Sequence, residues 1–227
     1  MTQDLKDRLL DAALSHVPFD GWSDRTLRAA AGDAGIDPAL ARALFPRGGV
    51  DLALAYHAQG DAAMVARLAT TDLSARRYRD RIALAIRTRL ELADRELVRR
   101  GSTLFSLPQY AADGARAIWS TADRIWTALG DTSQDVNWYT KRATLSAVYG
   151  ATVLYWLGDD TPGHQATWDF LDRRIEGVMQ FEKLKAGIRE NPVGKMLLSG
   201  PFKVMQGIRA PKLPANLPGR AGTDPKP

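Results

Sequence analysis

Cysteine is absent from this 227-residue sequence, and histidine occurs only at His16, His57 and His164. Without thiols the chain has no disulfides, thiolate metal sites or cysteine nucleophiles, which fits a reducing compartment. The Glu-x-x-His motif of di-iron bundles is missing, as are the P-loop, the dinucleotide fingerprint and the serine-hydrolase motif. The sequence therefore predicts no metal, no cofactor and no catalytic residue, and we expect a binding protein rather than an enzyme.

Hydrophobic segments of membrane-spanning length are also lacking. Residues 143–157 (ATLSAVYGATVLYWL) carry no charge, but a bilayer span needs about 20 residues. A helix that is apolar on all sides is typically buried at the centre of a bundle, and here it is also suited to lining a cavity. The polar N-terminus has no apolar segment typical of a secretory signal, so we expect a cytosolic or already processed chain.

The positive charge is concentrated at one end of the chain. Residues 1–60 have a net charge of −2, residues 61–182 of 0 and residues 183–227 of +7. A basic segment of this kind is drawn to anionic surfaces. The C-terminal fifth of the sequence is therefore the part predicted to meet a membrane.

Alanine, leucine and arginine dominate the sequence, and alternating β-type runs are absent, so the fold class is all-α. Pro, Gly and Asp clusters separate the predicted helices, which cover residues 4–16, 24–34, 38–45, 48–69, 74–100, 108–129, 134–157, 162–185 and 192–208. We expect an N-terminal helix-turn-helix-like subdomain at 1–60 and a helical bundle at 61–190. A membrane-binding helix at 191–209 and a Pro-rich, disordered tail at 210–227 follow.

The N-terminal region resembles the DNA-binding domain of the tetracycline-repressor (TetR) family. The resemblance is carried by residues 8–14 (RLLDAAL), 21–23 (GWS), 34–37 (AGID) and 44–46 (LFP). It implies a TetR-like bundle with Gly35 in the turn of a helix-turn-helix, and such bundles usually form homodimers. The fold thus leaves open a ligand-responsive transcription regulator, and a structural dimer is a third possibility.

Charge argues against DNA binding by this region. Phosphate neutralisation by Lys and Arg supplies most non-specific affinity for DNA, yet residues 1–60 are net negative. The segment at the position of the recognition helix, 37–45 (DPALARALF), offers only Arg42 to phosphates or bases. We therefore predict that the fold is kept without a nucleic-acid partner.

A second resemblance covers most of the chain and is densest at residues 123–182. Its motifs are Asp123 and Trp126, residues 130–142 (GDTSQDVNWYTKR) and residues 167–175 (TWDFLDRRI). This pattern is similar to the ubiquinone (coenzyme Q) biosynthesis accessory family. The resemblance implies a non-catalytic protein that binds isoprenoid quinone precursors in an apolar cavity. It also implies presentation of the lipid to the di-iron demethoxyubiquinone hydroxylase or to another enzyme of the pathway.

Two sets of site residues follow from these observations. We expect the lipid cavity to be lined by Trp119, Trp126, Leu145, Tyr149 and Trp156. The resemblance places a partner-binding surface at Asp135, Asn137, Trp138, Tyr139 and Arg142. Adjacent residues on a helix point about 100° apart, so Trp138 and Tyr139 cannot both enter one seam, and Trp, Tyr and Arg dominate interface hot spots. Without the resemblance, one aromatic ring in the core and the other covering a neighbouring helix explains the pair equally well.

The segment around 193–209 has the pattern of an amphipathic helix lying on a membrane. Apolar side chains share one side and basic ones gather opposite, which is typical of interfacial helices. The predicted membrane-binding residues are Lys195, Leu197, Leu198, Phe202, Lys203, Val204, Met205, Ile208 and Arg209. Packing of the same apolar stripe back onto the bundle is the alternative. The expected location is the cytoplasmic face of a bacterial inner membrane, or the matrix side in a mitochondrion.

Overall fold

The computed structural model describes the backbone of residues 2–190 and the side chains of residues 2–180. Every regular element in this part of the chain is a helix, which confirms the all-α prediction. The elements are α1 (Thr2–Leu14), α2 (Val17–Asp20), α3 (Asp24–Ala34), α4 (Pro38–Leu44), α5 (Gly49–Ala69), α6 (Tyr78–Glu91), α7 (Arg95–Phe105), α8 (Ala111–Ala128), α9 (Val136–Leu157), η1 (Pro162–His164) and α10 (Gln165–Glu190). The predicted membrane helix at 191–209 and tail at 210–227 lie outside the described residues.

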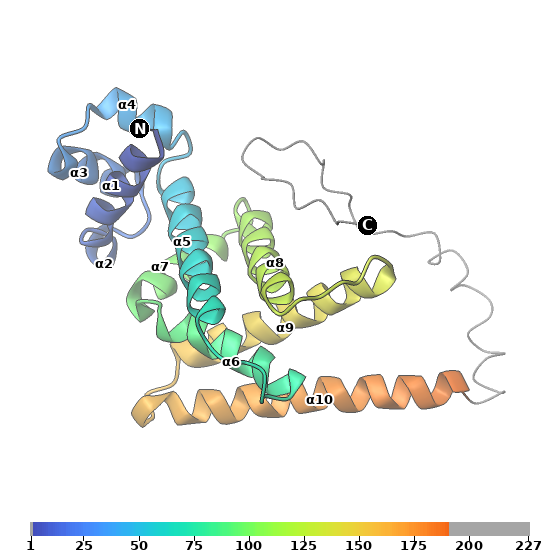
Figure 1. Cartoon of the computed structure of the whole chain (residues 1–227). Coiled ribbons are helices and arrows are strands. Elements are labelled where there is room, and N and C mark those ends of the chain that lie inside the picture. The colour runs from blue at the N-terminus through green and yellow to red at the C-terminus, as the bar shows by residue number, and fades with distance from the viewer. Residues whose placement is uncertain (1, 191–227) are drawn as a thin grey trace.

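Helices α1 to α4 gather at one end of the long helix α5 (Figure 1). Leu9 of α1 and Leu27 of α3 are buried in one apolar core that these helices share. The hydroxyl of Ser23 accepts a hydrogen bond from the Thr26 backbone N–H and caps α3. Gly35 ends α3 at a φ of 63°, a left-handed conformation that suits glycine. The helix-turn-helix predicted around Gly35 is thereby confirmed.

The prediction of a single helix over 74–100 was wrong, because this region forms two helices, α6 and α7. Helix α6 ends at Glu91, and Asp94 accepts hydrogen bonds from the backbone N–H groups of Glu96 and Leu97. Its carboxylate satisfies donors that lack a partner in the first turn of α7. Gly101, which follows the predicted helix 74–100 and was expected to end it, lies inside α7. The turn lets α7 contact α2 on one side and α8 and α9 on the other.

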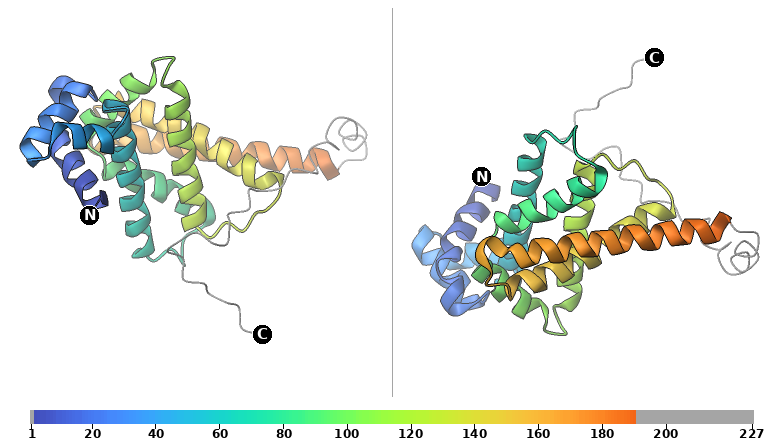
Figure 2. Two further views of the ribbon diagram at one scale, coloured as in Figure 1. Left: turned by 90° about the horizontal axis from the view of Figure 1, so that it is seen from above. Right: turned by 90° about the horizontal axis from the view of Figure 1, so that it is seen from below.

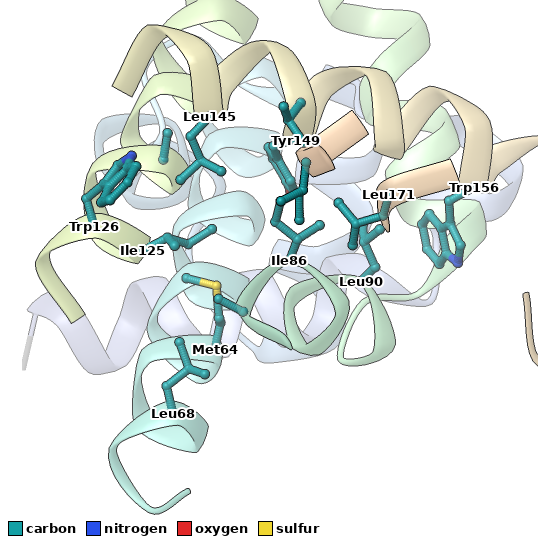
Figure 3. Close-up of a cluster of buried hydrophobic side chains, with 14 of the residues drawn as sticks. Met64, Leu68, Ile86, Leu90, Ile125, Trp126, Leu145, Tyr149, Trp156 and Leu171 are labelled. Atoms are coloured by element: carbon teal, nitrogen blue, oxygen red, sulfur yellow. The ribbon is translucent and has the colours of Figure 1, made fainter. Parts of the chain in front are cut away.

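Helices α5, α6, α8, α9 and α10 enclose the larger apolar core. Trp126 and Trp156 lie at opposite ends of this cluster, with Leu145 and Tyr149 of α9 between them (Figure 3). Helix α10 packs along α9 and α6, and its last turns extend beyond α8 and α9 (Figure 2). The α9 and α10 pair therefore forms one long side of the bundle.

Helix α9 carries the uncharged stretch 143–157, which was expected to be buried on all sides. Tyr149 and Trp156 are buried, but Leu154 is 68% exposed, so the expectation holds for only one face of the helix. Tyr155, next to Leu154, is 39% exposed as well, so this end of α9 presents apolar surface to solvent. In the region described, no helix has the length and apolar character needed to cross a bilayer.

Candidate functional site

A cavity of about 410 Å³ opens between α5, α6, α7, α8 and α9. Its volume lies within the range of roughly 300–1,000 Å³ that is usual for small-molecule sites. The apolar part of the wall includes Trp22, Leu97, Phe105, Ile118, Val153 and Leu154. Since Leu154 is largely exposed, the apolar wall continues to the protein surface. Such a space suits an elongated apolar ligand that enters from outside.

Small residues make room for this cavity. Gly101 of α7 and Gly150 of α9 both line it. A Cβ atom added at Gly150 would meet Ile118 Cδ1 at 3.6 Å, an ordinary van der Waals distance. A Cβ atom at Gly101 would meet the indole nitrogen of Trp22, also at 3.6 Å. Neither glycine is therefore needed for a close approach between two helix backbones. Larger side chains at these two positions would fill the cavity.

Trp22 connects the N-terminal subdomain to the cavity wall. Its indole N–H donates a hydrogen bond to the backbone oxygen of Leu97, 3.1 Å away, and its ring lies 5.4 Å from the ring of Tyr56. Arg100 of α7 donates a further hydrogen bond to the backbone oxygen of Pro18 at 2.6 Å. The subdomain that binds DNA in repressors thus contributes Trp22 to the cavity wall here. The resemblance to the TetR family did not predict this contribution.

One side of the cavity is polar. We use the term polar cluster for His57, Asp61, Arg89, Thr121 and Tyr149, of which His57, Arg89 and Tyr149 line the cavity. Arg89 Nε donates to Asp61 Oδ1 at 2.8 Å, and the Thr121 hydroxyl donates to the same carboxylate oxygen at 2.9 Å. The Tyr149 hydroxyl also hydrogen-bonds the Thr121 side chain. Asp61 and Arg89 are fully or almost fully buried and form an ion pair, and Nε of the partly exposed Arg124 lies 4.0 Å from the second carboxylate oxygen of Asp61.

His57 joins the polar cluster to the open space. Its Nε2 lies 2.7 Å from the Thr121 hydroxyl oxygen and 3.0 Å from the backbone oxygen of Ala117. Burial lowers the pKa of His57, because the charged form is poorly solvated there, and this outweighs the attraction of Asp61. Burial also raises the pKa of Tyr149. Both groups are therefore neutral hydrogen-bonding groups near pH 7.

The residues predicted to line the lipid cavity are placed differently by the structure. Tyr149 lines the cavity described above. Trp126, Leu145 and Trp156 are packed in the larger core, whereas Trp119 is half-buried with its ring 6.1 Å from that of Trp138. Aromatic and uncharged residues mark buried positions, but their spacing did not distinguish a packed interior from a cavity wall. The polar cluster was missed, because Asp61 and Arg89 lie in sequences that also suit a solvated helix face.

The predicted partner surface brings two aromatic rings together. Trp138 and Tyr139 are both half-buried, and their rings meet edge to face with centroids 4.8 Å apart. Trp119 of α8 extends the aromatic cluster. Partly exposed aromatic rings in the first turn of a helix are suited to anchoring a protein interface. This geometry is compatible with a partner-binding surface, which stays a prediction.

Arg142 was expected near solvent with the aromatic pair, and this was wrong. Its side chain is only 3% exposed and forms ion pairs with Asp123 and Asp131. The guanidinium lies under the Trp138 ring, 3.9 Å from the centroid. A buried charge needs such partners because desolvation is costly. Arg142 therefore supports Trp138 from beneath.

Asp131 completes this support. Burial alone would raise the pKa of Asp131, but hydrogen bonds from Lys141, Ser133 and Arg142 lower it to about 2. Its side chain is 2% exposed, so the carboxylate is charged and paired inside the fold. Asp131 therefore belongs to an ion-pair network, and Asp135 is the residue that caps α9.

The remaining predicted partner residues form the actual cap of α9. Asp135 is the residue before the helix, and its carboxylate accepts from the backbone N–H of Asn137 at 2.9 Å. The Asn137 side chain donates to the other carboxylate oxygen at 3.0 Å. Both residues are exposed. They therefore orient the turn that carries Trp138 while remaining accessible.

The helix-turn-helix has no unpaired positive charge on the described recognition-helix segment 37–45. Arg42, the only basic residue of that segment, donates to Asp24 at 2.8 Å. Asp37 caps α4 by accepting from the N–H groups of Ala39 and Leu40. A phosphate would have to compete with Asp24 for the guanidinium. The geometry thus adds to the charge argument against DNA binding.

Comparison with known proteins gives matches of two kinds. Residues 111–182 match the family model described as COQ9. The chain is similar to the ubiquinone biosynthesis protein COQ9, mitochondrial, from Drosophila melanogaster, with 31% identity over 79% of this chain and 57% of that protein. The corresponding proteins of Rattus norvegicus and Homo sapiens are 30% and 28% identical over 87% of this chain and 65% and 64% of their own lengths. The chain thus spans less than two thirds of these relatives.

The structural comparison concerns the fold alone. The TetR transcriptional regulator from Nitrosomonas europaea superposes with a TM-score of 0.62 at 18% sequence identity, over 76% of this chain and 97% of that one. This likeness confirms the TetR-like fold. The sequence matches confirm the resemblance to the ubiquinone biosynthesis family, and the family model covers the whole segment in which the motifs are densest.

Proposed function

We propose that this chain, a relative of the COQ9 ubiquinone biosynthesis proteins, is a non-catalytic accessory protein of ubiquinone biosynthesis that binds an isoprenoid quinone precursor. The observation that carries the proposal is the largely apolar cavity with its buried polar side, located between α5, α6, α7, α8 and α9. Sequence similarity to proteins named for ubiquinone biosynthesis supplies the class of ligand.

The physical task of such a protein is transfer of a lipid out of a bilayer. Each CH₂ group exposed to water costs about 0.8 kcal/mol, so a polyprenyl tail leaves the membrane only for an apolar environment. The wall formed by Leu97, Phe105 and Ile118 supports that role, and Leu154 extends it to the surface. The cavity would hold the head and the adjoining part of the tail, while the rest follows the apolar surface.

The membrane-facing part of the proposal rests on sequence. Residues 183–227 carry a net charge of +7, and the predicted amphipathic helix at 191–209 places basic and apolar side chains on opposite faces. Each Lys or Arg near an anionic leaflet contributes about 1 kcal/mol of attraction. This segment would hold the protein at a membrane surface, on the matrix side if the chain shares the mitochondrial location of its named relatives.

The partner-facing part rests on the aromatic pair at the start of α9. Trp138 and Tyr139 are half-buried side by side, and Arg142 and Asp131 fix the turn beneath them. A rigid, partly exposed aromatic cluster suits a protein interface, because little side-chain entropy is lost on binding. The partner would be an enzyme of the ubiquinone pathway, with the demethoxyubiquinone hydroxylase as the specific expectation.

Lipid extraction from the purified protein, followed by mass spectrometry, tests the cavity directly. Wild-type protein that is expressed in cells containing its native membrane lipids should carry a prenylated phenol or quinone. The variant Gly150→Leu should carry much less, because the new side chain occupies the cavity beside Ile118. Gly177→Leu is the matched control, since it places leucine on α10 where no heavy atom lies within 4 Å.

Either of two results would overturn the proposal. An empty wild-type protein would remove the basis for lipid binding and would favour a ligand-responsive regulator. Equal lipid content in wild type and Gly150→Leu, with Gly150→Leu folded as judged by circular dichroism, would show that the lipid binds elsewhere.

A further inference from the structure

The hydrogen bonds around His57 determine which of its nitrogens carries the proton. The backbone oxygen of Ala117 can only accept, and it lies 3.0 Å from Nε2. The Thr121 hydroxyl gives its proton to Asp61, so its oxygen accepts as well. Nε2 must therefore be the protonated nitrogen, and in the neutral ring Nδ1 is an acceptor. No hydrogen bond within the described residues is directed to Nδ1.

Arg89 provides the complementary group. A guanidinium has five N–H donors, and the hydrogen bonds to Asp61 and to the backbone oxygen of His57 use two of them. Arg89 is 2% exposed, yet it lines the cavity together with His57 and Tyr149. The polar side of the cavity thus combines an acceptor from α5 with donors from α6.

This arrangement is costly unless it serves a ligand. A buried ion pair such as Asp61–Arg89 is often no more stabilising than apolar residues of the same volume. Cavities that bind small molecules, in contrast, typically combine apolar walls with a few placed polar groups that orient the ligand. The cluster forms the polar part of a cavity wall that is otherwise largely apolar, where it would orient the head of a lipid.

We propose that His57 and Arg89 form a head-group subsite for a neutral prenylated phenol or quinol, with His57 Nδ1 accepting the ring hydroxyl and Arg89 donating to a second ring oxygen. This inference rests on the proposed function and adds the chemical form of the head that is bound. A fully oxidised quinone or an alkyl ether has no O–H to donate, so it leaves His57 Nδ1 unsatisfied. An anionic head would lose its hydration on entering this largely apolar cavity, where the Arg89 guanidinium is already paired with Asp61.

Two ligands that differ only in the hydroxyl test the subsite. The probes are a short-chain prenylated methoxyphenol and its O-methyl ether, which share ring, tail and second oxygen. Their affinities are measured by the change in tryptophan fluorescence on titration, since Trp22 lines the cavity. The full-length wild-type chain should bind the phenol about tenfold more tightly than the ether. This difference corresponds to the one hydrogen bond that the ether cannot donate to His57 Nδ1.

Substituted variants test whether His57 causes the preference for the phenol over the ether. His57→Leu should bind the phenol and the ether with equal affinity. His16→Leu is the matched control, because it makes the same substitution at a histidine that pairs with Asp33 and is not among the residues that line the cavity. This variant should keep the tenfold preference.

The outcomes separate the two proposals. If wild type binds neither probe, lipid binding itself fails, and the subsite fails with it. If wild type binds both probes with equal affinity, the cavity binds lipids but the subsite is refuted, without reliance on any variant. A preference that persists in folded His57→Leu would also overturn the assignment to His57.

Discussion

Arg89 of α6 and Asp61 of α5 form an ion pair of 2.8 Å inside the protein, with side chains 3% and 1% exposed. The pair joins two helices, and because Arg89 lines the cavity, the pair links the stability of the fold to the shape of the site. Thr121 and the backbone of His57 provide further hydrogen bonds to it. This combination makes the two residues sensitive positions for both folding and binding.

Replacing Asp61 by asparagine should destabilise the protein strongly. The charge of Arg89 would remain buried without a counter-ion, and breaking such a pair typically costs about 3–5 kcal/mol. Urea denaturation of Asp61→Asn gives the free energy of unfolding. Glu91→Gln is the matched control, because the Arg87–Glu91 pair is about half exposed on both sides and should contribute less than about 1 kcal/mol. Similar losses in both variants would contradict the role of burial.

The stability of the protein should fall in acid partly through Asp131. Its folded pKa of about 2 lies below the unfolded value of about 3.8, so its contribution is complete above pH 4 to 5. It is lost as the pH falls from about 4 towards 2, because the unfolded chain takes up the proton first. Asp131→Asn should reduce the slope of stability against pH in this window. An unchanged slope would show that the pairing with Lys141 and Arg142 does not hold Asp131 ionised.

Trp138→Ala should weaken association with the pathway enzyme while leaving lipid content unchanged. An aromatic hot spot contributes about 2 kcal/mol or more, which corresponds to a roughly 30-fold weaker Kd. Association with the demethoxyubiquinone hydroxylase is measured by surface plasmon resonance. Tyr155→Ala is the control, since Tyr155 is a 39% exposed aromatic residue near the other end of α9. If both variants bind the hydroxylase as wild type does, the interface lies elsewhere.

Gly150→Ala should stabilise the protein. Glycine inside a helix costs roughly 0.5–1 kcal/mol relative to alanine, and the added Cβ meets Ile118 at an acceptable 3.6 Å. Thermal unfolding should therefore show a higher Tm for the empty protein. A lower Tm would mean that the backbone at Gly150 has a closer neighbour than Ile118, and the use of Gly150→Leu as a cavity-filling variant would then fail.

The sequence by itself determined the helical fold and the resemblance to a known family. Apolar periodicity, the Pro, Gly and Asp clusters between helices and the glycine at position 35 are local features, and local features define helices and turns. The motifs from Asp123 onwards likewise indicated the ubiquinone biosynthesis family. In contrast, the break at Asp94 has neither glycine nor proline to mark it, so a continuous helix was predicted there.

Only the tertiary structure decided which residues form the site. Trp126 and Trp156 are of a residue type that often lines cavities. Neighbouring helices pack against them, however, and place them in the close-packed core. Arg142 reads as a surface charge until its partners Asp123 and Asp131 are found 19 and 11 positions earlier in the chain. Asp61, Arg89 and Thr121 are likewise separated in sequence and meet only when α5, α6 and α8 pack together. Contacts between distant segments depend on packing geometry, which periodicity and composition do not encode.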